Sequence, residues 1–391
     1  MNNCLNIFGE IFSFILIGGG TFYFGVCLWA LYGYFRKHST NLNYKPSVSV
    51  IVPARNEEKN IGALLSDLAV QTYPQEKLEI IVVDDASSDT TPEIVLEHSR
   101  KFPNIKLVGT HNSKLTYSYK KRAVCEGIMA SSGEIIITTD ADCRVPSNWL
   151  ENKAAYFLPG TDLVAGDVFH NSKGLIGALE ILEMSGVQAM AAGLMNNGFP
   201  VTCNGANLAY RRTAFEKAGG FEDIGSFVSG DDDLLMQKIA RNNPSGVIYI
   251  SGRENAVTTK GATGISDFIS RRTRWASKIA NYPSAWAVAM LSLFFIFFIG
   301  SLLWFMLALA GVYEWEPLLI CTALKVLGDF PLVYTGVKNQ RREKFLFLFP
   351  LAEILHIPYI LLVTLRGYFG TFEWSGRKSS SVTPGIGDTQ A

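Results

Sequence analysis

The stretch EIIITTDADC (134–143) decides the fold that we expect. Residues 134–139 are rich in β-branched side chains and predict a buried strand, which ends at Asp140 and Asp142. Residues two apart in an extended chain lie on the same face, so both carboxylates point the same way. Two such carboxylates repel each other unless a cation lies between them, and Mg²⁺ or Mn²⁺ is the usual partner when substrate phosphates complete the shell. A solvated turn that carries two aspartates by chance is the alternative.

Similar strands recur between residue 48 and about residue 281, and helical segments separate them. Apolar strands are also predicted at SVSVIVP (47–53), LEIIVV (78–83) and NIKLVGT (104–110). Apolar residues at helical spacing occur in NEEKNIGALLSDLAVQT (56–72), SSDTTPEIVLEHSRK (87–101) and YKKRAVCEGIMASS (119–132). Strands that are apolar on both faces and alternate with helices predict an α/β fold with a mostly parallel sheet covered on two sides.

Polar clusters follow several of these strands directly. They are PARNE (53–57), DDASSD (84–89) and DADC (140–143). The carboxyl ends of parallel strands meet at one edge of a sheet, and ligands bind there. We therefore expect these clusters to line one cleft.

Composition and charge exclude two classes of protein. The chain has 391 residues, 48% of them hydrophobic, and carries 35 basic and 35 acidic side chains. This balance gives no basic excess for nucleic-acid binding and no disordered composition, so we expect no nucleic-acid partner. The 6 cysteines form no CxxC pair, which argues against a zinc site or a disulfide framework and suits a reducing cytosol.

Apolar residues are concentrated at the two ends of the chain. Residues 11–35 are almost uncharged and exceed the ~20 apolar residues that span a bilayer. Arg36, Lys37 and His38 follow, and positive side chains beside a span favour the cytoplasmic side. A cleaved signal peptide is the alternative, but the apolar core is too long for one and no basic segment precedes it.

The C-terminal third contains two or three more predicted spans, at residues 285–312, 317–337 and 345–369. The basic loop KNQRREK (338–344) is expected on the cytoplasmic side. Prolines and charged residues interrupt the last segment, so the side of the C-terminus stays open. We expect a multi-pass protein of the cell membrane. Its parts are an N-terminal anchor (1–44), a cytoplasmic α/β domain (45–283), a membrane region (284–372) and a flexible tail (373–391).

The order of the motifs resembles that of family 2 glycosyltransferases. The matching stretches are VSVIVPARNEE, EIIVVDDASSDTT, the region of Lys120 and Lys121, TTDADC, CNGANLAYRR, SGDDDLLMQKI and RRTRW. Members of that family have a GT-A fold and transfer a sugar from a nucleotide-diphosphate sugar with inversion at the anomeric carbon. With the flanking spans included, the chain is similar to membrane-integrated members such as ceramide glucosyltransferases and cellulose or hyaluronan synthases.

The resemblance implies a donor site built from several of these motifs. The loop after the first strand would hold the nucleoside, the next aspartate pair would contact the base and ribose, and a lysine would lie at the donor. These residues are Pro53, Arg55, Asn56, Glu57, Asp84, Asp85 and Lys120, with Lys121 as a substitute for Lys120. Asp140 and Asp142 would engage the sugar nucleotide and its Mg²⁺ or Mn²⁺. An ordinary helix start capped by Asn56 is the alternative for the first motif.

The acidic run Asp231, Asp232 and Asp233 precedes a predicted helix. In the family, an acidic pair followed by x-x-Leu supplies the general base. This alignment selects Asp232, with Asp231 on the acceptor side. Crowding by its neighbours is expected to raise the proton affinity of Asp232, which suits removal of a proton from an acceptor hydroxyl. An acidic helix N-terminus that interacts with the helix dipole is the alternative.

Two more motifs are assigned to the diphosphate and the acceptor. Arg271, Arg274 and Trp275 resemble a Q-x-x-R-W motif, with Arg271 where glutamine is usual. The arginines would bind the diphosphate and the indole would stack on a sugar, although an interfacial helix beside a span needs the same residue types. The segment CNGANLAYRR resembles the stretch near the acceptor. Its candidate residues are Asn204, Gly205 and Arg211.

These observations predict an inverting glycosyltransferase that uses a nucleotide-sugar donor, a UDP-sugar by analogy with the family. The flanking spans favour a membrane lipid or a lipid-linked saccharide as acceptor. A processive polysaccharide synthase is one alternative, and a non-catalytic nucleotide-sugar sensor on the same fold is another.

Overall fold

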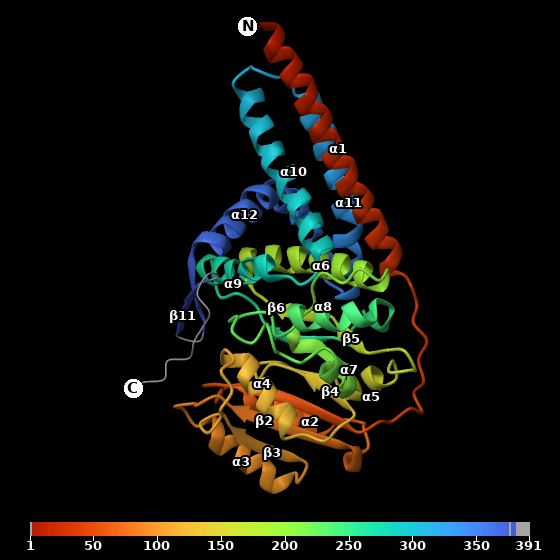
Figure 1. The fold of residues 1–391 in the computed structure, drawn as a ribbon, viewed down its shortest axis with the longest axis vertical. Helices are drawn as coiled ribbons and strands as arrows, with labels where there is room; N and C mark the ends of the chain where they lie inside the picture. The colour runs from red at the N-terminus through yellow and green to blue at the C-terminus, as the bar shows by residue number, and fades with distance from the viewer. Residues whose placement is uncertain (1, 375–376, 381–391) are drawn as a thin grey trace.

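The computed structural model describes residues 2–374 and 377–380, and Figure 1 shows a sheet domain joined to a group of long helices. The domain contains a 7-stranded sheet in the order β3-β2-β1-β4-β7-β5-β8. The strands of this sheet are β1 (Val48–Ala54), β2 (Leu78–Asp84), β3 (Ile105–Gly109), β4 (Ile135–Thr138), β5 (Leu163–Gly166), β7 (Leu208–Arg211) and β8 (Val247–Ile250). Strands β1 to β4 are parallel, as are β5 and β8, whereas β7 is antiparallel to β4 and β5. The predicted mostly parallel sheet is confirmed.

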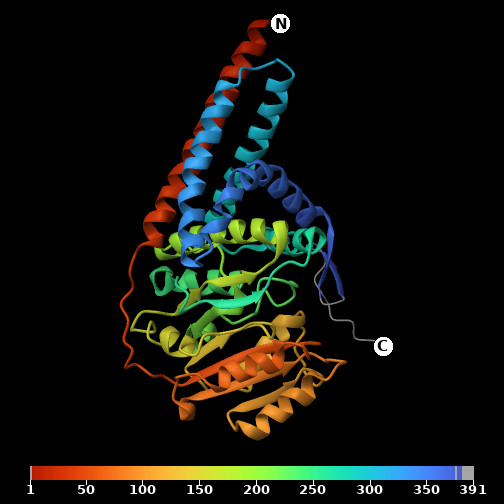
Figure 2. The same cartoon turned by 180° about the vertical axis from the view of Figure 1, so that it is seen from behind.

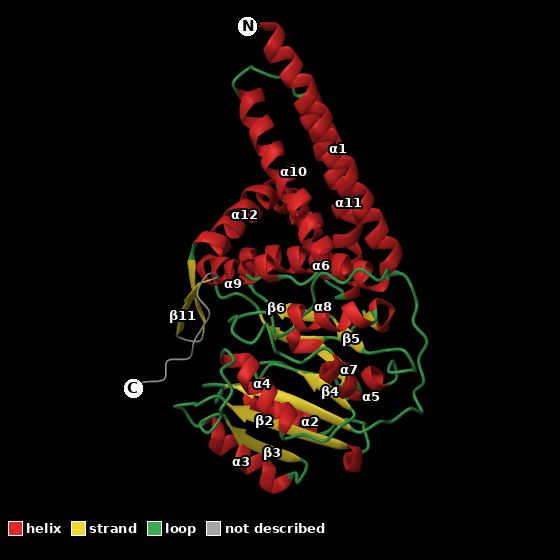
Figure 3. Cartoon of the chain, in the orientation of Figure 1, coloured by secondary structure: helices red, strands yellow, loops and turns green. Residues whose placement is uncertain are grey.

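Helices pack on both faces of the sheet, as Figure 3 shows. Val50 and Val52 of β1 belong to one buried cluster, with apolar residues of α2, α3 and α5, whereas Ile51 belongs to a second cluster with residues of α4 and α8. Alternate strand residues point to opposite faces, so both faces must be apolar. The helices are α2 (Ile61–Ala69), α3 (Thr91–Lys101), α4 (Tyr119–Met129), α5 (Trp149–Ala154), α7 (Arg212–Lys217) and α8 (Asp233–Asn242).

Smaller elements complete the described chain. Strands β6 (Val168–Asn171) and β9 (Val257–Lys260) form a parallel pair. The first part of the predicted flexible tail, which starts at residue 373, belongs to a pair of strands instead. Here β10 (Thr371–Trp374) and β11 (Arg377–Ser380) pair antiparallel. The rest of that predicted tail lies outside the described residues. The 3₁₀ turns are η1 (Gln75–Lys77), η2 (Gly205–Asn207), η3 (Pro244–Gly246), η4 (Ile279–Asn281) and η5 (Glu343–Leu348).

Long apolar helices form at every segment that was predicted to span a membrane. They are α1 (Asn2–Tyr34), α10 (Ala285–Leu309), α11 (Glu316–Asn339) and α12 (Phe349–Phe369). Together with α6 (Gly174–Asn196), the described residues contain 5 helices that are long and apolar enough to cross a membrane. Figures 1 and 2 show α1, α10 and α11 extending away from the domain, with α1 beside α11 and α12 arching over α9 (Ile265–Ser277).

Helix α6 is an element that the sequence analysis does not predict. It lies crosswise between the sheet domain and the long helices in Figures 1 and 2, and it contacts both α1 and α11. The helix backbones approach closely at two glycines. A Cβ atom on Gly193 would overlap the backbone oxygen of Ala30 in α1, and one on Gly336 of α11 would overlap that of Ser185. Helix α6 therefore joins the domain to the long helices.

Candidate active site

The two aspartates that follow β4 lie at the expected edge of the sheet. Asp140 forms an ion pair with Lys120 of α4, with 2.6 Å between Oδ1 and Nζ. Asp142 accepts a hydrogen bond of 3.1 Å from the hydroxyl of Thr259 in β9. The turn therefore faces α4 on one side and the smaller strand pair on the other.

Lys120 brings two acidic clusters together. Its ammonium group lies 2.6 Å from Asp140 and 3.2 Å from Asp231, residues that are distant in sequence. Burial lowers the pKa of Lys120, but Asp140 and then Asp231 outweigh that effect and raise it, so the lysine stays charged. Lys121 has a different environment, because its ammonium group donates to the carbonyl oxygens of Phe227 and Ser229 at 2.6 and 2.7 Å. The structure therefore places the ammonium group of Lys120 at the acidic clusters and that of Lys121 against the loop of Phe227 and Ser229.

Asp232 lies at the start of α8, where its carboxylate is held on several sides. It accepts hydrogen bonds from the backbone NH of Asp233 at 2.7 Å and of Gly205 at 3.1 Å. Lys278 lies 3.1 Å away. Burial would raise the pKa of Asp232, but Lys278 and then Lys120 outweigh it and hold that pKa below its ordinary value. The prediction that the proton affinity of Asp232 is raised is therefore wrong, because the sequence did not reveal that Lys278 and Lys120 lie beside it.

Asp233 is fully buried and has a structural role. Its carboxylate accepts hydrogen bonds from the backbone NH of Cys203 at 2.8 Å and from the hydroxyl groups of Thr202 and Tyr282. Lys278 lies 2.6 Å from Oδ2, the oxygen that also accepts from Tyr282. These contacts fix the first turn of α8, and so they fix Asp231 and Asp232.

The residues of the predicted nucleoside loop lie at the ends of β1 and β2. Arg55 donates to the backbone oxygen of Asp85 at 2.7 Å. The Asp85 carboxylate accepts from Arg122 at 2.7 Å and from Thr110 at 2.9 Å. Asp84 accepts from the backbone NH of Ser87 at 3.2 Å and so closes the turn after β2.

Asn56 does not cap the next helix, which was the alternative for this motif. Its backbone has φ 54°, a left-handed conformation that asparagine tolerates, and its side-chain oxygen accepts from the NH of Ser88 at 2.8 Å. Helix α2 begins after Asn60 instead. The neighbouring Glu57 lines one cavity with Asp140 and Asp142. Burial raises its pKa, a hydrogen bond from Asn60 opposes this, and Asp142 and Asp140 raise it further.

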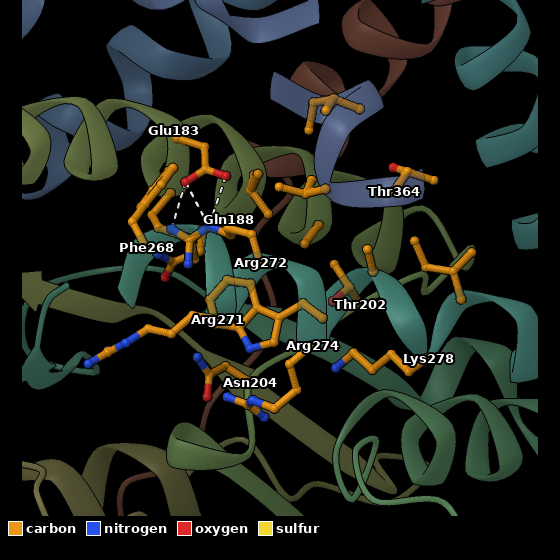
Figure 4. Close-up of a pocket in the computed structure, with 18 of the residues that line it drawn as sticks. Glu183, Gln188, Thr202, Asn204, Phe268, Arg271, Arg272, Arg274, Lys278 and Thr364 are labelled. Carbon is orange, nitrogen blue, oxygen red and sulfur yellow. Dashed lines mark hydrogen bonds and ion pairs between the residues drawn. The ribbon is translucent and has the colours of Figure 1, made fainter. Parts of the chain in front are cut away.

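Helix α9 carries the predicted diphosphate and acceptor residues. Arg271 donates to Asp267 at 2.9 Å and to the backbone oxygen of Lys260 at 3.1 Å. Arg274 lines the same cavity as Asp140, Asp231 and Asp232. Burial lowers its pKa, whereas Asp231, Asp232 and Asp140 act to raise it. Figure 4 shows Arg271, Arg274 and Lys278 on one side of the pocket together with Asn204.

Arg272 and Lys278 were missed by the sequence analysis. Arg272 is 4% exposed, pairs with Glu183 of α6 at 2.6 Å (dashed lines in Figure 4), and lies 4.3 Å from the ring centroid of Trp275. Lys278 follows Arg274 by one helical turn, a spacing that would have placed both cations on one face. Arg272 gave no such signal, because its partner lies on a helix that was not predicted.

One cavity of about 1500 Å³ collects most of the predicted site residues. The predicted residues that line it are Pro53, Arg55, Glu57, Asp85, Lys120, Asp140, Asp142, Asn204, Asp231, Asp232, Arg271, Arg274 and Trp275. The predicted residues Asn56, Asp84, Gly205 and Arg211 are not among its lining residues. Arg211 pairs with Glu134 at 2.5 Å, at the far end of the antiparallel pair β4 and β7, and is a wrong assignment. The same cavity continues between apolar residues of the long helices, including Leu291, Phe294, Phe298, Leu332 and Ile360.

The carboxylates at this edge fit part of a metal shell. No group of three or more His, Cys, Asp or Glu side chains that could hold a metal ion occurs within residues 2–374 and 377–380. Asp140 and Asp142 would therefore supply two hard oxygen ligands, and donor phosphates would supply others, which is how Mg²⁺ is usually bound.

Known proteins share these motifs and this fold. The chain matches the family described as Glycosyl transferase family 2 over residues 49–219, and that described as Glycosyl transferase family group 2 over residues 135–368. A Beta-monoglucosyldiacylglycerol synthase of Trichormus variabilis is 26% identical over 360 residues, which cover 86% of this chain and 73% of that protein.

Other similarities cover different parts of the chain. The Probable glycosyltransferase YdaM of Bacillus subtilis is 36% identical over 197 residues, which cover 48% of this chain and 46% of YdaM, so this chain spans less than half of that relative. The mannosyltransferase PcManGT of Pyrobaculum calidifontis, solved with GDP-Man and Mn²⁺, superposes with a TM-score of 0.55 at 22% identity and covers 91% of this chain and 97% of that one. The second family match spans more than half of the chain and includes Asp140, Asp232 and α9. This protein belongs to the family 2 glycosyltransferases, and its α/β domain has the GT-A fold.

Proposed function

We propose that this glycosyltransferase moves a sugar from a nucleotide-diphosphate sugar to a membrane lipid or a lipid-linked saccharide, with inversion at the anomeric carbon. The cavity carries this proposal, because carboxylates and cations line its domain end and it continues between mostly apolar side chains of the long helices. A water-soluble acceptor needs no such apolar chamber, whereas a lipid gains from burial there. The relative named Beta-monoglucosyldiacylglycerol synthase supports a lipid acceptor.

Asp232 is the proposed general base. Its carboxylate would take the proton of the acceptor hydroxyl while the oxygen forms a bond to the anomeric carbon and the bond to the nucleoside diphosphate breaks. The lowered pKa, in which Lys278 and Lys120 outweigh burial, keeps Asp232 ionised at neutral pH and so ready to accept a proton. A single displacement inverts the configuration.

The donor is proposed to bind between the loops that follow β1, β2 and β4. Lys120 and Arg274 lie at the acidic clusters and would meet the diphosphate, with Arg271 as a further donor of hydrogen bonds. Mg²⁺ or Mn²⁺ bound by Asp140 and Asp142 would neutralise charge on the leaving diphosphate. Asp85 and Arg55 would contact the nucleoside. A UDP-sugar is the proposed donor, by analogy with the family.

We also propose that the protein crosses the cell membrane several times, with the α/β domain in the cytoplasm. Helices α1 and α11 both end beside the domain in Figures 1 and 2. The residues that follow them include Arg36, Lys37, Arg341 and Arg342. Basic residues beside spans favour the cytoplasmic side, and here they lie on the same side as the domain.

The test is transfer by the detergent-purified full chain from UDP-, GDP- and dTDP-sugars, with and without Mn²⁺, to a total membrane lipid extract. The expected result is a metal-dependent glycolipid that is lost in Asp232→Asn and reduced in Asp142→Asn at the Mn²⁺ concentration that saturates the wild type. The control is Asp223→Asn, which removes one exposed carboxylate at a left-handed position that asparagine tolerates. Long water-soluble chains would support the polysaccharide synthase instead. Unchanged turnover in Asp232→Asn would contradict the assignment of the base, and binding without turnover would support the sensor.

A further inference from the structure

The long helices contain a polar cluster that the proposed transfer step does not use. Lys325 of α11 lies 2.7 Å from Asp329 Oδ2 and 2.6 Å from Glu353 Oε2 of α12. The other oxygen of Asp329 accepts a hydrogen bond of 2.6 Å from the hydroxyl of Tyr23 in α1. Together with His356 of α12, these residues make a group of five that we call the interhelical cluster. Helices α1, α11 and α12 thus meet at one buried ammonium group.

The interhelical cluster lies well away from the sheet domain. Asp329 is roughly 15 Å along α11 from Asn339, at the 1.5 Å rise per residue of an α-helix. The Asn339 amide donates to Asp167 of the domain at 2.6 Å, which fixes that end of α11. Ionisable residues at such a depth among apolar helices are costly and are usually functional.

The cluster faces the same cavity as the acidic site. Tyr23, Asp329, Glu353 and His356 line this cavity, whereas Lys325 is 3% exposed and is not among its lining residues. Two carboxyl groups share one ammonium group, so the cluster has more acceptor oxygens than donors to pair them. Nδ1 of His356 is buried without a hydrogen-bond partner in the described part of the chain, and the imidazole lies 5.7 Å from the ring of Phe298. The cavity wall therefore offers hydrogen-bonding atoms, most of which are carboxyl oxygens that accept.

A phosphate group would be disfavoured here. In a wall of low polarity, two carboxylates with one cation repel a further anion strongly. Hydroxyl groups can instead donate to the carboxylates and interact with the imidazole without adding charge. At the domain end of the cavity, Lys120 and Lys278 are each paired with two aspartates.

We propose that the acceptor is an uncharged lipid whose polar group carries hydroxyls, and that the interhelical cluster binds this group in the membrane half of the cavity. The inference rests on the proposed function, since the lipid must pass along this cavity to reach Asp232. Apolar side chains such as Leu332, which follows Asp329 on α11 toward the domain, also line the cavity. They would leave hydroxyls unpaired if the cavity held no polar binding site beyond them.

Binding of three lipids with identical chains to the full chain, in detergent and without donor, tests the proposal. The probes are dioctanoylglycerol, its methyl ether and dioctanoyl phosphatidic acid. The expected result is that the wild type binds dioctanoylglycerol at least about tenfold more tightly than the other two. In Glu353→Gln, which keeps the pair of Lys325 and Asp329, the preference over phosphatidic acid should shrink about tenfold.

The matched control is Leu355→Ala, an apolar lining residue on the same helix, which should keep the wild-type preference. His356→Phe is the second variant should Glu353→Gln fail to fold by thermal unfolding, and it should lose the preference for the free hydroxyl over the methyl ether. Equal or tighter binding of phosphatidic acid by the wild type would overturn the proposal, as would an unchanged preference in folded Glu353→Gln. Failure of the proposed function would look different, since no lipid would then be glycosylated when donor is added, whatever the binding series shows.

Discussion

The ammonium group of Lys278 lies 3.1 Å from Asp232 Oδ1 and 2.6 Å from Asp233 Oδ2, and it therefore bridges two adjacent carboxylates at the start of α8. Lys278 is 8% exposed and Asp233 is fully buried, so neither charge is well solvated. The bridge connects the segment after α9 to the proposed base. Helix α9 also carries Arg274, so one helix and its C-cap residue position both the base and a cation beside it.

Replacing Lys278 by methionine removes the charge and keeps much of the volume. We expect the pKa of Asp232 to rise, because burial then acts with less opposition, so the acidic limb of kcat/KM moves to higher pH. Asp233 would also lose its buried cation, at a cost of about 3–5 kcal/mol in the free energy of unfolding. A pH–rate profile and thermal unfolding check both effects. Lys278→Arg, which keeps the charge, should shift the limb far less, and an unmoved limb in Lys278→Met would contradict the assignment.

Lys120 and Lys121 provide a matched pair for the donor site. We expect Lys120→Met to lower kcat/KM by about 10²-fold, because the cation between Asp140 and Asp231 is lost. Lys121→Met should instead leave two loop carbonyl oxygens without their donor and cost about 1–3 kcal/mol of stability, with near-normal kcat/KM. Steady-state kinetics at saturating lipid and thermal unfolding separate the two. Equal kinetic losses would argue against the specific role of Lys120.

Asp142→Asn should weaken the response to metal without disturbing the fold, since an amide oxygen can still accept from Thr259. We expect the apparent affinity for Mn²⁺ to fall at least about tenfold, because a neutral ligand replaces a carboxylate. Titration of activity with Mn²⁺ measures this. Asp223→Asn serves as the control, and a Mn²⁺ titration of Asp142→Asn that overlays the wild type would remove Asp142 from the metal site.

The pairs formed by Arg272 and Arg271 on α9 should differ in strength. Glu183→Gln removes the nearer carboxylate from the buried guanidinium of Arg272 and leaves Glu180 at 3.5 Å, and we expect a loss of about 3–5 kcal/mol in the free energy of unfolding. Asp267→Asn breaks the more exposed pair with Arg271 and should cost about 0–1 kcal/mol. Thermal unfolding in detergent compares the variants. Similar losses in both would show that Glu183 does not hold α9.

Asp167 should make stability depend on pH. Burial raises its pKa to about 6, although hydrogen bonds from Gly252, Tyr249 and Asn339 oppose this. The folded state then binds more protons than the unfolded state between about pH 4 and 6, so this residue stabilises the fold at low pH and loses that effect as pH rises through 6. The difference is about 3 kcal/mol. Asp167→Asn should flatten this part of the stability curve relative to the wild type, and a parallel curve would contradict the shift.

Much of the fold could be predicted from the sequence because the signals are local. The strand ending at Asp140 is a short β-branched run, and α10 and α11 are long apolar runs whose observed ends fall within a few residues of the predicted ones. Helix α6 was missed because Glu180, Glu183 and four glycines interrupt its apolar pattern. Its stability comes from close packing against α1 and α11, which no local pattern reports.

The sequence by itself determined which chemistry the chain carries: the acidic clusters at strand and helix ends, the cations of α9 and the apolar segments on either side. These follow from residue type and spacing. The tertiary structure alone decided which charges meet. Lys120 rather than Lys121 reaches Asp140 because neighbouring residues of a helix point about 100° apart. The lowered pKa of Asp232 and the cluster around Lys325 depend on residues far apart in the chain, and electrostatic energy is set by distance and burial in space rather than by separation in sequence.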